Sequence, residues 1–379
     1  MRHVIVCATD AGGARNLAPL LPVLVRRGTG PIVMTCRAHR ELFQANATCD
    51  VILTDDGQPR DLDQLVADTQ PAAIICGTTR YASPDRELTA RARGRVRTVA
   101  VLDEWYNYRL RFENADSGDL AYLPDAVAVQ DEQARSEAAA EGIPAGVCHV
   151  TGSPALADLT RRAQALAESP PPVPPCLDGV GDRPVVTFLS ETHAADYGTS
   201  PEAPGTLGPF IGYTENSVRD AIVEMCSRLQ RPVTVIEKLH PAAQEYAAPV
   251  VSRDVDWRPL RRTDLWALLW HSDVVIGMRS MALLEADILG CEAVSFQPGL
   301  IGPERCTAVR LGLIPKLDRP RDLEAWCAQR LATQRRAVRV IRRHRFALPD
   351  AAERVVDLAL GALLEISAPR VPLPPGEVR

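Results

Sequence analysis

The sequence alternates short apolar runs with amphipathic stretches, and this alternation limits the possible folds more than any other feature. Apolar runs at residues 3–8, 31–35 and 72–76 are each followed by polar residues and a helical pattern. Strands that alternate with helices over short connections form a parallel sheet with helices on both faces. The same alternation resumes at residues 184–190. The sequence therefore predicts the α/β class, with two Rossmann-like βα domains.

A proline-rich segment interrupts the alternation near the middle of the chain. Residues 169–175 read Ser-Pro-Pro-Pro-Val-Pro-Pro, which stiffens the chain as polyproline II and continues neither a helix nor a sheet. We therefore expect a linker here, followed by a second domain, a long apolar helix and a disordered tail. The predicted bounds are 1–164 for the first domain, 165–182 for the linker, 183–348 for the second domain, 349–366 for the helix and 367–379 for the tail.

Composition indicates a soluble globular protein, with 46% hydrophobic and 24% charged residues among 379. A net charge of −5 argues against nonspecific nucleic-acid binding. The ten cysteines include no Cys-x-x-Cys pair, which favours reduced thiols in a cytoplasmic protein. No apolar stretch approaches the ~20 residues needed to cross a bilayer, so we expect at most peripheral membrane contact.

The strand at Val233–Ile236 ends in a polar sequence, Glu-Lys-Leu-His-Pro. Ligands of open α/β sheets bind where strands end and helices begin. His240, with its direction fixed by Pro241, could donate a hydrogen bond to a phosphate, or it could cap a helix. Lys238 could add positive charge on the same side, or it could be solvated.

Two more strand ends of the predicted second domain carry polar residues. The strand at 274–276 is followed by Gly277 and then by a helix that we expect to begin near Ser280. Arg279 and Ser280 would face a phosphate at that helix, and Glu285 could accept hydrogen bonds from ribose hydroxyls. The first strand of this domain ends in three residues suited to phosphate or base contacts: Ser190, Glu191 and Thr192.

Two candidate regions follow strands of the predicted first domain. Gly12, Gly13 and Arg15 lie in the loop and helix start after residues 3–8, where they could approach a ligand or form a plain turn. Asp103 and Glu104 follow the buried strand at 97–102, and their aromatic neighbours would raise a carboxyl pKa toward that of a general base. Alternatively, these carboxylates cap a helix or pair with nearby arginines, Arg109 or Arg111.

No Asp-x-Asp sequence stands where a metal site would be expected. Asp61 and Asp63 open a predicted helix, where carboxylates act as caps. Asp254 and Asp256 lie in a segment that we predict to be a loop. We therefore predict no metal and no cofactor other than a nucleotide-activated substrate.

The order strand–Lys-Leu-His-Pro, then strand–Gly-x-x-Ser-x-x-x-x-Glu-Ala, resembles the C-terminal domain of GT-B-fold glycosyltransferases. The pattern is most similar to the His-Pro group of bacterial sialyltransferases, Kdo transferases and CDP-glycerol polymerases. This resemblance implies an acceptor-side first domain, a nucleotide-donor second domain and a final helix that crosses back to the first. It also implies that Asp103 is the base and that His240 is the leaving-group acid or a phosphate ligand, although Trp105 stands where the sialyltransferase motif has Gly.

The resemblance predicts a metal-independent transferase that moves a sugar or polyol phosphate from a CMP- or CDP-linked donor to an acceptor hydroxyl. The alternative is a nucleotide-sugar epimerase or hydrolase of the UDP-N-acetylglucosamine 2-epimerase type, which shares the fold and eliminates the nucleotide without an acceptor. That family's His-Val-Glu-Ala-Gly-like stretch is replaced here by Asp103-Glu104-Trp105. A non-catalytic scaffold is the third hypothesis.

Overall fold

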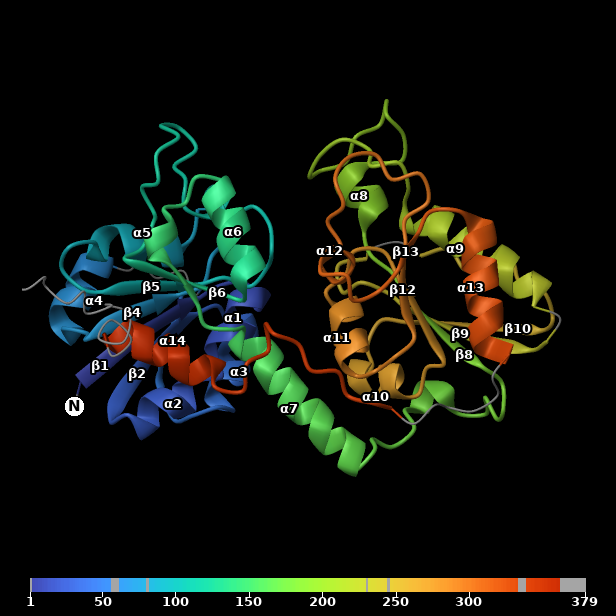
Figure 1. Ribbon diagram of the computed structural model, residues 1–379, viewed down its shortest axis with the longest axis horizontal. Helices are drawn as coiled ribbons and strands as arrows, with labels where there is room; N and C mark the ends of the chain where they lie inside the picture. The colour runs from blue at the N-terminus through green and yellow to red at the C-terminus, as the bar shows by residue number, and fades with distance from the viewer. Residues whose placement is uncertain are drawn as a thin grey trace, which may run out of the picture. The chain divides into compact units, whose positions relative to one another are not determined.

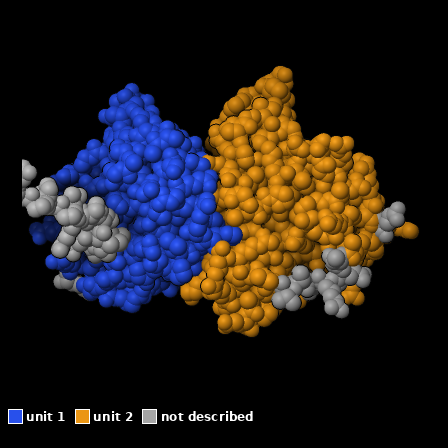
Figure 2. All heavy atoms as spheres, in the orientation of Figure 1, with its two compact units in different colours: residues 1–159, 344–379 blue, residues 160–343 orange. Residues whose placement is uncertain are grey.

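The computed structural model describes residues 2–55, 61–79, 82–229, 231–243, 246–332 and 339–361. The chain divides into two compact units (Figure 2). Unit 1 is formed by the described parts of residues 1–159 and 344–379, and unit 2 by those of residues 160–343. Each unit is built around a parallel sheet, so the predicted α/β class with two Rossmann-like domains is confirmed.

The described part of unit 1 contains a seven-stranded sheet in the order β3-β2-β1-β4-β5-β6-β7 (Figure 1). Its central strands are almost entirely apolar and buried, as expected for a sheet covered on both faces. The strands are β1 (Arg2–Ala8), β2 (Thr29–Thr35), β3 (Asp50–Leu53), β4 (Ala73–Cys76), β5 (Thr98–Val101), β6 (Ala126–Val129) and β7 (Cys148–Val150).

Most helices of unit 1 connect successive strands of its sheet. They are α1 (Ala11–Leu17), α2 (Leu20–Arg26), α3 (Arg40–Gln44), α4 (Leu62–Thr69), α5 (Pro84–Ala92) and α6 (Glu132–Ala140). The predicted cap is confirmed at α4, where the Asp61 carboxylate accepts a hydrogen bond from the backbone of Gln64 at 3.0 Å. Short 3-10 turns occur at Arg37–His39, Arg109–Arg111 and Ala145–Val147.

The C-terminal helix α14 (Ala351–Leu360) returns to unit 1, as predicted. Val355, Val356 and Leu358 are buried in the same apolar cluster as residues of α1, α2 and the sheet. Burying apolar side chains contributes roughly 25 cal/mol per Å² of area removed from water. Two ion pairs lie at the edge of this contact, at the C-terminal end of α2. Arg26 pairs with Glu353 at 2.9 Å, and Arg27 pairs with Asp357 at 2.6 Å.

The described part of unit 2 contains a six-stranded sheet in the order β10-β9-β8-β11-β12-β13. Its strands are β8 (Val185–Leu189), β9 (Val233–Lys238), β10 (Val255–Leu260), β11 (Val274–Gly277), β12 (Ala293–Phe296) and β13 (Lys316–Leu317). Its helices are α8 (His193–Tyr197), α9 (Glu215–Arg228), α10 (Leu265–Trp270), α11 (Ala282–Ile288), α12 (Thr307–Arg310) and α13 (Pro320–Ala332).

The boundary between the units falls within α7 (Pro154–Glu168), between residues 159 and 160. This helix extends four residues into the segment predicted as the linker, 165–182, which also contains a 3-10 turn at Pro175–Leu177. The domain bounds given by the sequence analysis remain predictions. The predicted tail, 367–379, lies outside the described residues.

Three local predictions for the second half of the chain are wrong. The segment around Asp254 and Asp256 was expected to be a loop, but β10 begins at Val255 and pairs with β9. The polar, Gly- and Pro-rich sequence of residues 191–215 predicts a long loop, but this segment contains the short helix α8. The basic sequence of residues 335–345 predicts a helix, but its described part, residues 339–345, contains none.

Candidate functional site

Each sheet has a point where the strand order reverses direction, and polar residues gather at both points. In unit 1 the reversal lies between β1 and β4, and in unit 2 it lies between β8 and β11. Open α/β sheets bind ligands at such switch points, outside the carboxyl ends of the strands. A ligand site is therefore expected at one or both of these switch points.

At the unit 1 switch point, Gly12 and Gly13, which were predicted to lie in a loop, belong to the first turn of α1. Asp10 caps α1 by accepting a hydrogen bond from the backbone of Gly13 at 2.7 Å. Its second oxygen accepts one from the Thr79 hydroxyl, beyond the end of β4, at 2.6 Å. Gly13 is buried close to Gly77, whose Cα would lie 3.3 Å from a Cβ at Gly13. Arg15 lies on the exposed face of α1. The ligand role of these residues stays a prediction.

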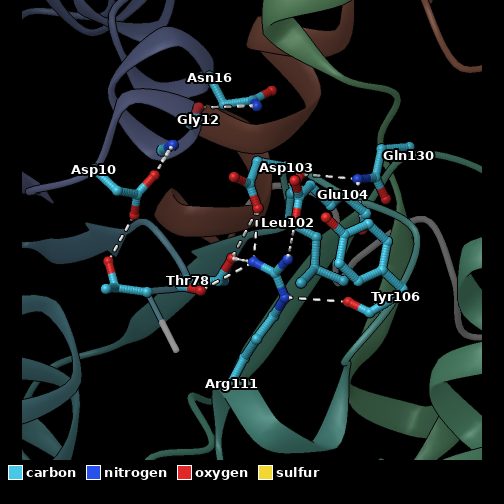
Figure 3. A network of polar contacts seen from close by, with 12 residues as sticks. Asp10, Gly12, Asn16, Thr78, Leu102, Asp103, Glu104, Tyr106, Arg111 and Gln130 are labelled. Carbon is cyan, nitrogen blue, oxygen red and sulfur yellow. Dashed lines mark hydrogen bonds and ion pairs between the residues drawn. The ribbon is translucent and has the colours of Figure 1, made fainter. Parts of the chain in front are cut away.

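Asp103 and Glu104 share one buried guanidinium, that of Arg111 (Figure 3). Its Nη1 lies 2.6 Å from Asp103 Oδ1, and its Nη2 lies 3.0 Å from Glu104 Oε2. The Arg111 side chain is 3% exposed, whereas those of Asp103 and Glu104 are 14% and 25% exposed. The structure therefore corresponds to the alternative in which these carboxylates pair with an arginine.

The pKa of Arg111 is raised chiefly by the two carboxylates that it contacts. Burial opposes the charged form of Arg111, but the attraction of Asp103 and Glu104 outweighs it and raises the pKa of Arg111. The Trp105 ring is fully buried, and its indole N–H donates to Asp131 at 3.2 Å. The role of Asp103 as a base is untested by this geometry and remains a prediction.

At the unit 2 switch point, Glu191 joins the ends of β8 and β11. Its Oε1 accepts a hydrogen bond from the backbone N–H of Arg279 at 2.6 Å. The Arg279 guanidinium lies over the ring of Tyr197, 4.7 Å from its centroid. The neighbouring Ser190 is buried, and its backbone N–H donates a hydrogen bond to the backbone carbonyl of Lys238 at 3.0 Å. Thr192 donates its hydroxyl to Asp196 at 2.7 Å.

Sequence reasoning missed His193, which lies in the same place. This imidazole is 2% exposed and is flanked edge-to-face by the rings of Tyr197 and Tyr213. Its Nε2 lies within ion-pair distance of Glu191 Oε2, at 2.9 Å, and its Nδ1 has no hydrogen-bond partner among the described residues. The sequence signal that could have identified His193 is its position directly after the polar strand-end residues Ser-Glu-Thr.

Glu191 yields a prediction for the pH dependence of stability. Burial would raise the pKa of Glu191, but the His193 imidazole and the backbone N–H and guanidinium of Arg279 together hold it below the usual value. A lowered folded-state pKa stabilises the fold above the ordinary carboxyl pKa of about 4.3, and this contribution is lost as the pH falls through the folded value.

Glu191→Gln should therefore destabilise the protein by about 1–3 kcal/mol at neutral pH, because a carboxylate that is only 15% exposed and has two partners is lost. The difference from wild type should shrink below about pH 4. Urea unfolding of both proteins at neutral and acidic pH measures this difference. A gap of the same size at both pH values would contradict the assignment.

His240 and Lys238 lie one strand away from the unit 2 switch point. Lys238 is the last residue of β9, and His240 follows two residues later. The strand β9 pairs with β8 on the side opposite to β11. His240 is exposed, as is Pro241, and its Nδ1 accepts a hydrogen bond from the backbone of Ala242 at 3.2 Å. Burial lowers the pKa of Lys238, whose ammonium donates to the Leu239 carbonyl at 2.8 Å. The proposed phosphate role of His240 is neither supported nor opposed by these contacts.

The region after β11 agrees with the prediction at the helix start and differs from it at Glu285. The helix α11 begins at Ala282, near Ser280 as predicted, and the Ser280 hydroxyl accepts a hydrogen bond from the Ala282 backbone at 3.2 Å. Glu285 is buried, and its Oε2 accepts a hydrogen bond from the indole of Trp266 at 2.8 Å. The structure thus brings Glu191, Ser190 and Arg279 together, but gives Glu285 a protein partner.

A pocket of about 680 Å³ opens within unit 2, beside this switch point. Small-molecule sites commonly measure about 300–1,000 Å³. Ser190, Glu191 and Thr192 line it on one side, and Arg219 and Tyr246 line it on another. The three residues predicted at the end of β8 therefore border a ligand-sized cavity.

Among the residues that the structure describes, no group of three or more His, Cys, Asp or Glu side chains is placed to hold a metal ion. The same residues include no helix with the length and apolar character needed to span a membrane. The predictions of metal independence and cytoplasmic localisation remain predictions.

Comparison with known proteins shows a shared fold. No protein-family model and no curated protein matches the sequence. The structure resembles UDP-GlcNAc 2-epimerase from Neisseria meningitidis bound to UDP-GlcNAc, with a TM-score of 0.63, 14% identity and coverage of 96% of this chain and 100% of that one. It also resembles the Methanocaldococcus jannaschii UDP-GlcNAc 2-epimerase in complex with UDP-GlcNAc and UDP, with a TM-score of 0.61, 13% identity and coverage of 94% and 99%.

A third similar structure is the glycotransferase of kitacinnamycin, with a TM-score of 0.53, 14% identity and coverage of 97% of this chain and 99% of that one. At these identities the similarities show the fold alone, which is GT-B-like and consists of two Rossmann-like domains. They do not distinguish the His-Pro group of transferases, so that more specific resemblance stays a prediction.

Proposed function

We propose that this protein is an enzyme acting on a nucleotide-linked sugar, with a reaction of the UDP-N-acetylglucosamine 2-epimerase kind. The observation that carries the proposal is the unit 2 switch point, where Glu191, His193 and Arg279 lie at the ends of β8 and β11. A ligand-sized pocket of about 680 Å³ borders it. The Arg279 guanidinium suits a diphosphate, because charge-assisted hydrogen bonds to phosphate oxygens are strong. The fold shared with 2-epimerases over 96% of the chain supports the same assignment.

Epimerisation at C2 of a sugar requires the C2–H bond to break. In the proposed elimination, a base takes the proton from C2, and the C–H electron pair forms a C1=C2 double bond as the C1–O bond breaks and its electron pair leaves with the nucleoside diphosphate. Protonation of C2 on the opposite face, with return of the nucleoside diphosphate to the original face of C1, yields the C2 epimer. We propose Asp103, with Glu104 beside it, for the proton transfer, and Arg279 and His240 as phosphate ligands.

A second candidate is the transferase that the His-Pro resemblance implies, with a CMP- or CDP-linked donor and an acceptor hydroxyl. The similarity to the kitacinnamycin glycotransferase supports it at a lower TM-score, 0.53. In this reaction Asp103 would deprotonate the acceptor hydroxyl, and the enzyme would not consume the donor when no acceptor is present. The requirement for an acceptor therefore separates the two candidates.

The test is an incubation with UDP-N-acetylglucosamine in D2O without any acceptor, followed by NMR. The proposal predicts deuterium at C2 of the sugar, formation of the C2 epimer and a small amount of free UDP. Acceptor-dependent consumption of a CMP-linked sugar, without exchange at C2, would favour the transferase. An absence of both reactions would overturn the proposal.

The same assay tests metal independence. Excess EDTA should leave the exchange rate unchanged, because we expect side chains to offset the charge on the leaving group. A strict requirement for added Mg²⁺ would contradict this prediction, and an exchange rate that is equal with and without EDTA would support it.

A further inference from the structure

Arg111 is built into unit 1 as a bridge between the ends of two neighbouring strands. It comes from the 3-10 turn Arg109–Arg111, and its guanidinium reaches Asp103, which follows β5. The same Nη1 lies 2.9 Å from the carbonyl and 2.6 Å from the hydroxyl of Thr78, which follows β4. Figure 3 shows these contacts converging on one side chain.

The segment that carries the two carboxylates is fixed through its backbone as well. The buried amide of Gln130 donates to the carbonyls of Leu102, at 3.1 Å, and Glu104, at 3.3 Å. On the other side, Asp103 Oδ2 faces Gly12 so closely that a Cβ there would lie 1.9 Å from it. Asp103 is therefore confined between Arg111 and the start of α1, with its Oδ1 held by the guanidinium.

We propose that Arg111 is the positioning residue for Asp103 and Glu104, and that the proton-transfer step of the proposed reaction depends on it. This inference rests on the proposed function. A planar guanidinium holds two carboxylates in fixed directions, which an ammonium cannot do. Misplacing a reacting group by about 1 Å can lower a rate on the order of 100-fold.

A purely structural arginine would have different consequences. Its loss would lower the amount of folded protein, and the activity of each folded molecule would stay constant. Arg109 provides a matched control, since it lies in the same 3-10 turn, is 39% exposed and pairs with Glu113 instead. The nucleotide site proposed in unit 2 provides an independent check on folding, because it is formed by other residues.

The experiment compares Arg111→Ala, Arg111→Lys and Arg109→Ala with wild type. Thermal melting gives the folded fraction, a UDP titration gives the Kd, and C2 deuterium exchange with UDP-N-acetylglucosamine gives the rate. Both Arg111 variants should keep the wild-type Kd for UDP within about twofold and lose roughly 100-fold in exchange rate. Methylguanidinium at millimolar concentration should restore part of the rate of Arg111→Ala, and Arg109→Ala should behave as wild type.

If the Arg111 variants exchange C2 hydrogen at the wild-type rate per folded molecule, this inference is overturned and the proposed function still stands. A loss that Arg109→Ala shares and methylguanidinium does not relieve would overturn it as well. If Arg111→Ala does not fold, Arg111→Lys decides the question. If wild type binds UDP but neither exchanges C2 hydrogen nor releases UDP, the proposed function fails and this inference fails with it.

Discussion

Replacing Arg219 by Met should lower the free energy of unfolding by about 3–5 kcal/mol, the cost of leaving a buried charge without its partner. Arg219 lies on α9, and its Nε and Nη2 hold the carboxylate of Glu237 at 2.7–3.0 Å. The Glu237 side chain is 0% exposed. Trp257 donates its indole N–H to the same carboxylate at 3.0 Å, which does not neutralise the charge.

Arg228 on the same helix supplies the matched control. It pairs with Glu224 and Glu324, but its side chain is 51% exposed. Arg228→Met should therefore cost less than about 1 kcal/mol. Denaturant unfolding monitored by tryptophan fluorescence measures both variants. Equal losses would contradict the account, and so would a smaller loss for Arg219→Met. Adding Glu237→Gln to Arg219→Met should recover part of the loss, because the uncompensated charge disappears.

The second large effect is expected from Gly12→Ala, which should reduce the C2 exchange rate on the order of 100-fold. A Cβ at residue 12 would lie 1.9 Å from Oδ2 and 2.9 Å from Cγ of Asp103, so the carboxylate must move. Arg111 and Thr78 hold its other oxygen, which leaves little freedom for a small shift. Alanine is the best helix former, so the helix α1 itself should not be weakened by the change.

Gly146→Ala is the control for this prediction, since a Cβ at Gly146 meets nothing within 4 Å. It should leave both stability and exchange near wild type. Gly12→Ala should still bind UDP, because its effect is confined to unit 1. An unchanged exchange rate in Gly12→Ala would show that the position of Asp103 does not matter for the reaction.

Much of the fold was accessible from the sequence, because buried parallel strands are continuous apolar runs. β1, β4 and β8 are of this kind, and all three were predicted. β10 was missed because its sequence, Val-Asp-Trp-Arg-Pro-Leu, alternates apolar and polar residues over only four positions and then contains a proline, which argues against a strand. Only its first residue, Val255, is buried, so the strand is stabilised by pairing with β9.

Residues 335–345, the basic segment predicted to be a helix, show a different limit of prediction from sequence. Arg339 donates hydrogen bonds to carbonyls at the end of α10, among them that of Trp270 at 3.2 Å. It also donates to the Gly290 carbonyl at 3.3 Å. These tertiary partners hold residues 339–343 against the domain, and helical periodicity in the sequence carries no information about them.

The candidate site was only partly predictable for the same reason. The strand-end rule identified Asp103, Glu191 and Arg279. From the sequence, Arg111 was one of two alternative partners of Asp103, and no local pattern indicates that its side chain spans two strands. His193 was missed because α8 is five residues long and follows a polar strand end, which resembles a loop.

The measurement that tests the central claim most directly is a thermal-shift screen of wild type, Arg279→Gln and His240→Ala against UDP, UMP, CDP, CMP, GDP and TDP. A nucleotide at about 100 times its Kd should stabilise the protein by ~2.7 kcal/mol. Arg321→Gln is the control, because that side chain is 73% exposed on α13. The account predicts a shift with UDP that Arg279→Gln abolishes and Arg321→Gln preserves. No shift with any nucleotide, or an equal shift in wild type and Arg279→Gln, would contradict the nucleotide site at the switch point of unit 2.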